Sequence, residues 1–88
     1  MNRFKMLKGV QKSYRQQGEI FFCCANYAHQ PKKIQGKIER LCLTAAGEHA
    51  EALLCYLTTD ASWQEVTRRF YISDRTLQRC RKKFYELW

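Results

Sequence analysis

Apolar residues near the C-terminal end of the chain recur every three to four positions, which is the spacing of one face of an α-helix. In residues 62–71, Val66 and Phe70 fall one turn apart. Ser62 and Glu65 have the spacing of a capping box, in which each side chain satisfies a backbone amide of the other residue. The pattern therefore predicts a helix that begins at Ser62 and ends near Tyr71.

A second helix is predicted for residues 73–87, directly after this one. Ser73 is a favourable N-cap, and Asp74 in the first turn complements the positive end of the helix dipole. At about 100° per residue, one side of this helix is apolar and the opposite side is basic and polar. The apolar side contains Leu77, Cys80, Phe84 and Leu87. The opposite side contains Arg75, Gln78, Arg79 and Lys82.

Such a helix is suited to the major groove of DNA. Its apolar side can fix it to other helices, while arginine and glutamine side chains reach base edges and lysine reaches phosphate. An ordinary solvated amphipathic helix is the alternative. The predicted base-contacting residues are Ser73, Arg75, Thr76, Gln78, Arg79 and Lys82. The predicted phosphate-contacting residues are Arg68, Arg69 and Lys83.

The sequence of residues 62–87 resembles a helix-turn-helix of the sigma-factor region 4 type, and in particular small phage-type transcriptional regulators of the ArpU and RinA kinds. The resemblance rests on Ser62-Trp63-Gln64-Glu65-Val66-Thr67 and on Ile72-Ser73-Asp74-Arg75-Thr76-Leu77. The family's core positions correspond here to Val66, Phe70, Ile72, Leu77 and Cys80. The resemblance implies a DNA-binding helix-turn-helix, preceded by a helix that packs across it.

Two positions depart from the family pattern. Thr67 stands where a small alanine is usual, and Tyr71 stands in the turn where glycine is common. A bulky residue disfavours a positive φ, so we expect the turn at Tyr71 to have a different geometry.

The rest of the chain is also predicted to be helical. The apolar segment 19–28 could form a strand, but no partner strand follows, so we expect one helix from the N-terminus to about Ala28. Further helices are predicted at 32–43 and 45–59, with Thr44 as a stop or cap and Gly47 near a joint. The expected fold is all-α: a compact bundle of about five helices with a C-terminal helix-turn-helix. It forms a single domain, 1–88, in which 1–43 holds the N-terminal helices and 44–88 the helix-turn-helix unit.

The first predicted helix has a basic side. It contains Lys5, Lys8, Lys12 and Arg15, spaced three to four residues apart. We favour a solvated helix face for these residues over a second surface for phosphates. Gly9 and Gly18 each weaken a helix by about 1 kcal/mol relative to alanine.

Composition narrows the possible partners. The 88 residues carry a net charge of +8, which favours a polyanion, with nucleic acid ahead of an anionic membrane surface. The longest apolar run, 20–25, is too short to span a bilayer, and the N-terminus has no secretory signal pattern. We therefore expect a cytoplasmic protein without a membrane association.

The five cysteines are predicted to be reduced thiols, three of them at helical core positions. Cys23, Cys24 and His29 could supply zinc ligands, but their spacing fits no common site. The sequence has no phosphate-binding glycine loop, zinc-protease motif or nucleophile elbow. We expect no cofactor, no metal and no enzymatic activity.

These observations predict a sequence-specific regulator of transcription, of phage or mobile-element type, that binds double-stranded DNA with helix 73–87. The first alternative is a protein-interaction module that contacts RNA polymerase or another partner, with segment 20–28 as its docking face. The second is a DNA-handling accessory subunit for recombination or packaging. A homodimer would suit paired half-sites in DNA.

Overall fold

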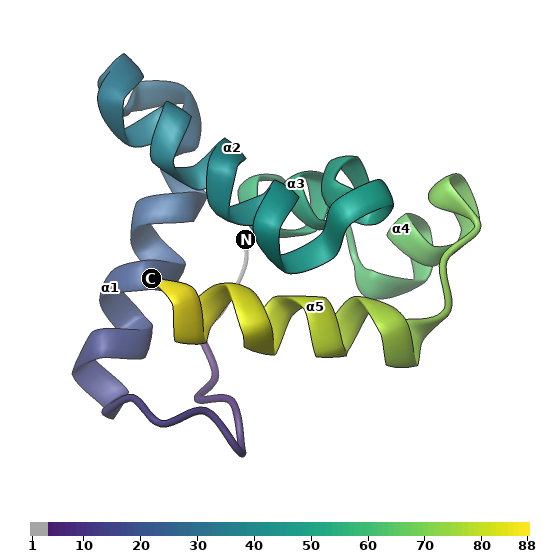
Figure 1. Ribbon diagram of the computed structural model, residues 1–88, viewed down its shortest axis with the longest axis horizontal. Coiled ribbons are helices and arrows are strands. Elements are labelled where there is room, and N and C mark those ends of the chain that lie inside the picture. Colours follow the sequence, from purple (N-terminus) through teal and green to yellow (C-terminus); the bar gives the residue numbers. More distant parts are fainter. Residues whose placement is uncertain (1–3) are drawn as a thin grey trace.

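The computed structural model describes residues 4–88, and every regular element in this part of the chain is helical (Figure 1). The α-helices are α1 (Tyr14–Ala25), α2 (Lys32–Ala46), α3 (Ala50–Thr58), α4 (Trp63–Phe70) and α5 (Asp74–Leu87). Two single 3₁₀ turns, Tyr27–His29 and Gly47–His49, precede α2 and α3. The predicted all-α class is confirmed.

α2 lies at the centre of the packing, because it contacts both α3 and α5. α1 packs against α3, while α4 contacts α3 and α5 (Figure 1). Buried side chains from every α-helix form one core, with Ile20, Ile38, Leu53, Val66 and Phe84 almost fully covered. The Cα radius of gyration is 11.9 Å, close to the ~12 Å expected for a compact chain of this length.

The predicted helix from the N-terminus to Ala28 is wrong at both ends. Residues 4–13 are not helical, and the part of this prediction that concerns residues 1–3 lies outside the described residues. α1 begins after Ser13, whose Oγ accepts a hydrogen bond from the Gln16 amide, while the Ser13 amide donates to Gln16 Oε1. This capping box fixes the start of the helix. At the other end, the chain leaves the α-helix at Asn26 for a 3₁₀ turn.

The joint between α2 and α3 lies where Gly47 predicts it. Gly47 has φ +55°, a conformation that glycine adopts without steric cost. The predicted stop at Thr44 is wrong, because Thr44 Oγ1 donates to the Arg40 carbonyl oxygen (3.1 Å) and the helix continues to Ala46. Pro31 directly precedes α2, which is where it can start a helix without a missing hydrogen bond.

α4 and α5 correspond to the two helices predicted at the C-terminal end. Ser62 Oγ accepts from the Glu65 amide (3.2 Å), and Ser73 Oγ accepts from the Thr76 amide (3.1 Å). The expectation for the turn at Tyr71 is wrong. Tyr71 does adopt the left-handed conformation, with φ 54° and ψ 42°.

Candidate nucleic-acid interface

α5 is attached to the molecule by one face. Leu77, Cys80 and Phe84 are buried, as the sequence pattern predicts. Leu87, expected on the same face, is instead 40% exposed, and Tyr85 is buried in its place at 3%. Tyr85 belongs to the same core as Leu77, Cys80 and Phe84, and burial raises the pKa of its phenol to about 12.

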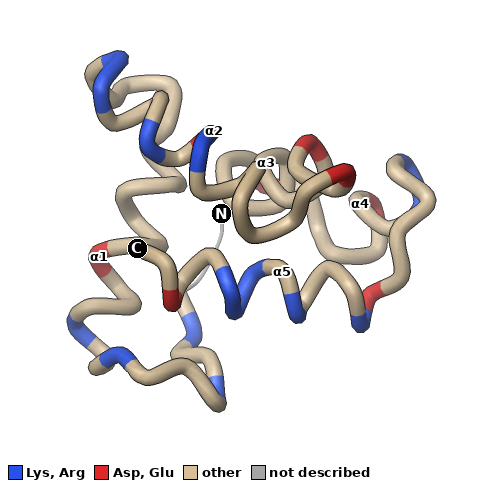
Figure 2. Tube along the Cα trace, viewed as in Figure 1, with Lys and Arg blue, Asp and Glu red and all other residues tan. Residues whose placement is uncertain are grey.

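The opposite face of α5 is an exposed basic stripe. Arg75, Arg79 and Lys82 are all exposed, and together with Gln78 they line one depression on the protein surface. Figure 2 shows basic positions spread along the length of α5. Acidic residues occur only at its two ends, at Asp74 and Glu86.

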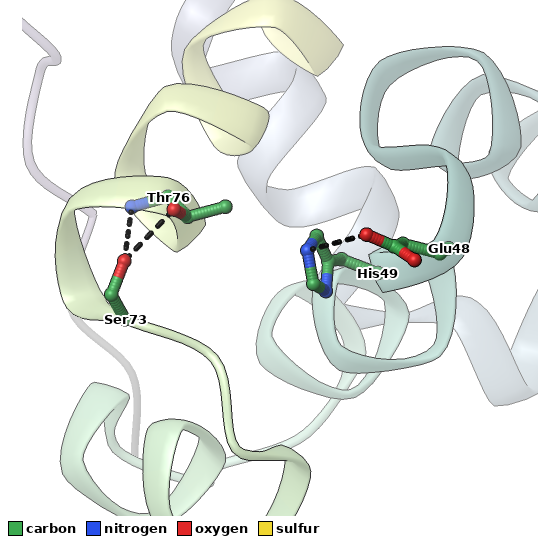
Figure 3. A network of polar contacts seen from close by, with 4 residues as sticks. All are labelled: Glu48, His49, Ser73 and Thr76. Carbon is green, nitrogen blue, oxygen red and sulfur yellow. Dashed lines mark hydrogen bonds and ion pairs between the residues drawn. The ribbon is translucent and has the colours of Figure 1, made fainter.

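Little within the protein neutralises this stripe. In the part of the chain that the structure describes, the one ion pair joins His49 Nε2 to Glu48 Oε1 at 3.5 Å (Figure 3). No described Lys or Arg side chain therefore lies within salt-bridge distance of a carboxylate. Unpaired cations on one surface produce a positive potential that attracts polyanions.

The Gln78 side chain is less free to contact a DNA base than its position on the helix predicts. Its side chain is half-buried, and Nε2 donates to Asp74 Oδ1 at 2.9 Å and lies 3.5 Å from the Tyr56 hydroxyl. Its Oε1 is buried without a partner among the described residues. Gln78 would have to exchange these protein contacts for a contact with a base.

The side chains of Ser73 and Thr76 also make hydrogen bonds within the protein, at the start of α5. The Ser73 hydroxyl donates to Thr76 Oγ1 (2.8 Å) and accepts from the Thr76 amide (Figure 3). Both residues lie beside Arg75, so the structure brings them to the same end of the stripe. Their hydroxyls mainly hold the first turn of the helix.

Sequence analysis missed Arg81, which connects α5 to α3. Its Nη1 donates to the Tyr56 hydroxyl (3.3 Å), and its guanidinium carbon lies 5.2 Å from the centre of the Tyr56 ring. Tyr56 thus holds both Gln78 and Arg81. An arginine in the α5 sequence gives no sign of this role, because the partner is 25 residues away in the chain.

The residues predicted to contact phosphate fall into two places. Lys83 is exposed on α5 beside the stripe. Arg68 and Arg69 are exposed at the end of α4, and Arg69 Nη1 lies 3.9 Å from Cys55 Sγ of α3. In Figure 2 the basic end of α4 is separated from the outer side of α5. The structure therefore joins Lys83 to the stripe and leaves the two arginines as a separate basic patch.

The cysteines are free thiols, and those in the core are poor nucleophiles. Burial raises the pKa of the Cys24 thiol well above its ordinary value and that of Cys42 to about 12. Burial also raises the pKa of Cys80. Residues 4–88 contain no group of three or more His, Cys, Asp or Glu side chains placed to hold a metal ion, and Cys23, Cys24 and His29 do not form one.

None of the helices in residues 4–88 combines the length and the apolar character that crossing a bilayer requires. No protein-family model matches the chain, and neither a curated protein nor a solved structure matches it. What is established is therefore the class: a compact all-α protein whose C-terminal helix carries an unpaired basic stripe.

Proposed function

We propose that this protein is a sequence-specific regulator of transcription, of phage or mobile-element type, which binds double-stranded DNA by inserting α5 into the major groove. The observation that supports the proposal most directly is the exposed stripe of Arg75, Arg79 and Lys82 on a helix that is fixed by its opposite face. The resemblance of residues 62–87 to sigma-factor region 4-type regulators is the reason for proposing transcription regulation, and phage or mobile-element origin, in addition to DNA binding.

The dimensions of α5 suit this role. Its 14 residues span about 21 Å at about 1.5 Å per residue, and the major groove is ~12 Å wide, enough for an α-helix. Arg75, Arg79 and Lys82 are spaced over two turns, so a helix lying in the groove would present all three to one stretch of bases. The buried residues Leu77, Cys80 and Phe84 keep the helix from rotating.

A protein-interaction module is a second candidate, supported by the aromatic side of α1. Phe22 is 55% exposed, and its ring packs against Phe21 and Phe4 at centroid distances of 5.1 and 6.3 Å. Apolar patches on a surface often mark sites of protein association. RNA polymerase or a second copy of the chain are the partners that this candidate would require.

A salt titration separates the two candidates. If the protein binds DNA through lysine and arginine, the logarithm of its affinity should fall linearly with the logarithm of salt concentration, by roughly 0.9 per phosphate contacted. Binding through the aromatic side of α1 should respond weakly to salt. A DNA affinity that hardly changes with salt would contradict the proposal.

Two substitutions on α5 test the division between base and phosphate contacts. Arg79→Ala should weaken binding to a preferred duplex by roughly 1–3 kcal/mol and relax the sequence preference, because a bidentate base contact is lost. Lys83→Ala should weaken binding to all duplexes by a similar factor, because a phosphate contact carries no sequence information. The measurement is selection of bound duplexes from a random pool, followed by fluorescence anisotropy with preferred and scrambled sequences. Identical behaviour of the two variants would show that this assignment is wrong.

A further inference from the structure

The segment before α1 is held in place although it is not helical. Gln17 of α1 is completely buried, and its Oε1 accepts a hydrogen bond from the Leu7 amide at 2.7 Å. Its Nε2 lies 3.1 Å from the Lys12 carbonyl oxygen and 3.4 Å from that of Leu7. Val10 anchors the middle of the same segment in the core, with 8% of its surface exposed. One amide side chain therefore fixes both ends of a loop of residues 7–12.

This anchoring brings the loop to the outer part of α5. A methyl group placed on Gly9 would lie 3.8 Å from Lys82 Nζ. Gly9 has φ +81°, so the chain turns sharply at this residue. In Figure 2 the basic positions of the loop and those of α5 lie on the same, lower, side of the molecule.

The loop adds positive charge to this side. Lys5 and Lys8 are exposed, and neither lies within salt-bridge distance of a carboxylate in the described part of the chain. Gly9, the residue after Lys8, lies against Lys82, so the loop adds its cations to the positive potential of this side, which attracts a polyanion. The sequence pattern favours a solvated helix face for these lysines, but the structure places them in a loop, which Gln17 of α1 holds in place.

We propose that the loop of residues 4–13, here called the N-terminal basic loop, is a second phosphate-binding element of the α5 interface, and that Gln17 is its positioning residue. The inference rests on the proposed DNA-binding function and extends it to a second segment. α5 in a groove would then be accompanied by the loop on the phosphates that border that groove. Because Gln17 fixes residues 7–12 of this loop before DNA arrives, less conformational entropy is lost on binding than for an unanchored segment.

The test compares two double variants that change the net charge equally. Lys5→Ala/Lys8→Ala removes two exposed lysines of the loop, and Lys32→Ala/Lys33→Ala removes two exposed lysines of α2. The first turn of α2 lies at the end of that helix remote from α5 (Figure 2). Binding of the full chain to a short duplex of mixed sequence is measured over a range of salt concentrations. The loop variant should bind several-fold more weakly, with a salt slope smaller by roughly 2. The α2 variant should keep the wild-type slope.

The outcomes separate this inference from the proposed function. If wild-type protein does not bind duplex DNA, both are overturned. If Arg79→Ala weakens binding while the two double variants behave alike, the α5 proposal stands and the role of the loop is overturned.

The role of Gln17 is tested by a double-mutant cycle. In a Gln17→Ala background, where the loop keeps Val10 in the core but loses its hydrogen bonds to α1, Lys5→Ala/Lys8→Ala should cost less affinity than it does in wild type, because a less well positioned loop contributes less. Gln17→Met provides a second variant, since it has a similar length but neither the acceptor for the Leu7 amide nor the donor to the Lys12 carbonyl, and its effect should match that of Gln17→Ala. Circular dichroism confirms that the compared variants are folded. Additive effects in both backgrounds would overturn the positioning role.

Discussion

Tyr71 combines an unfavourable backbone conformation with an almost fully exposed side chain. Its φ of 54° lies in the left-handed region, and its side chain is 94% exposed. For a residue with a Cβ this conformation costs roughly 1–2 kcal/mol. The conformation is maintained by its neighbours: the amides of Tyr71 and Ile72 both donate to the Thr67 carbonyl oxygen, and Ile72 is buried in the core.

Tyr71→Gly should therefore stabilise the protein by up to about 1 kcal/mol, since glycine removes the strain but loses more entropy on folding. Tyr71→Phe is the matched control, because it keeps the strained conformation and removes only the hydroxyl group. Urea denaturation of the three proteins measures the difference. A Tyr71→Gly variant less stable than wild type would mean that the exposed ring makes a favourable contribution to folding.

This residue also shows why the turn could not be predicted from the local sequence. Steric preference at Tyr71 alone argues against a positive φ. Burial of Ile72 and two hydrogen bonds to the Thr67 carbonyl oxygen outweigh that preference. The sum of these effects is visible only when the packing around α4 and α5 is known.

At the scale of the helices, capping residues make the starts of α4 and α5 predictable from the sequence. Ser62 and Ser73 precede clear apolar periodicity, and α4 and α5 begin directly after them. Ser13 and Gln16 form the same kind of signal before α1, but the weak periodicity of residues 4–14 concealed it. The anchoring of the loop by Gln17 joins residues ten positions apart, so no local pattern could reveal it.

The Ser73 cap makes a measurable contribution to α5. Ser73→Ala should lower the free energy of unfolding by about 1 kcal/mol, because the Thr76 amide loses its acceptor. Ser73→Asp retains an acceptor and should remain close to wild type. The urea midpoint, measured at constant salt, provides the comparison. Equal losses in both variants would indicate that the Ser73 hydroxyl has a role other than capping.

The candidate site was predictable only in part at this scale. The spacing of Arg75, Arg79 and Lys82 placed them on the exposed side of α5, and they are exposed. The involvement of Gln78 and Arg81 with Tyr56 could not be foreseen, because Tyr56 belongs to α3 and meets α5 only through tertiary packing. Helical spacing determines the direction of a side chain, and the neighbouring helices determine whether it is free.

At the scale of the whole molecule, the core contains a thiol and a phenol whose protons are held more tightly in the folded chain than in the unfolded chain. Burial raises the pKa of Cys42 from 9.0 to about 12 and that of Tyr85 from 10.0 to about 12. Above pH 9 the unfolded chain releases these protons more readily than the folded chain does. The free energy of unfolding should therefore decrease as the pH rises through this range.

Urea denaturation under reducing conditions between pH 8 and pH 12 tests this expectation. This pH range covers the ordinary pKa of the Cys42 thiol, 9.0, and its raised pKa in the folded protein, about 12. Cys42→Ala should lower stability at neutral pH, since it leaves a cavity, but it should also make the alkaline decrease shallower. Leu41→Ala, a half-buried neighbour on α2, should leave the pH dependence unchanged. An equally steep decrease in Cys42→Ala would show that this thiol does not titrate differently in the two states.

The burial of Gln17 provides a natural spectroscopic probe. A primary amide bonded to backbone groups through both its oxygen and its nitrogen is shielded from water, so its two protons should exchange slowly with solvent and their signals in a nitrogen-15 correlation spectrum should persist after transfer to heavy water. Those signals would report directly whether residues 7–12 remain fastened in solution. They would do so in the unaltered sequence, without a partner or a substitution.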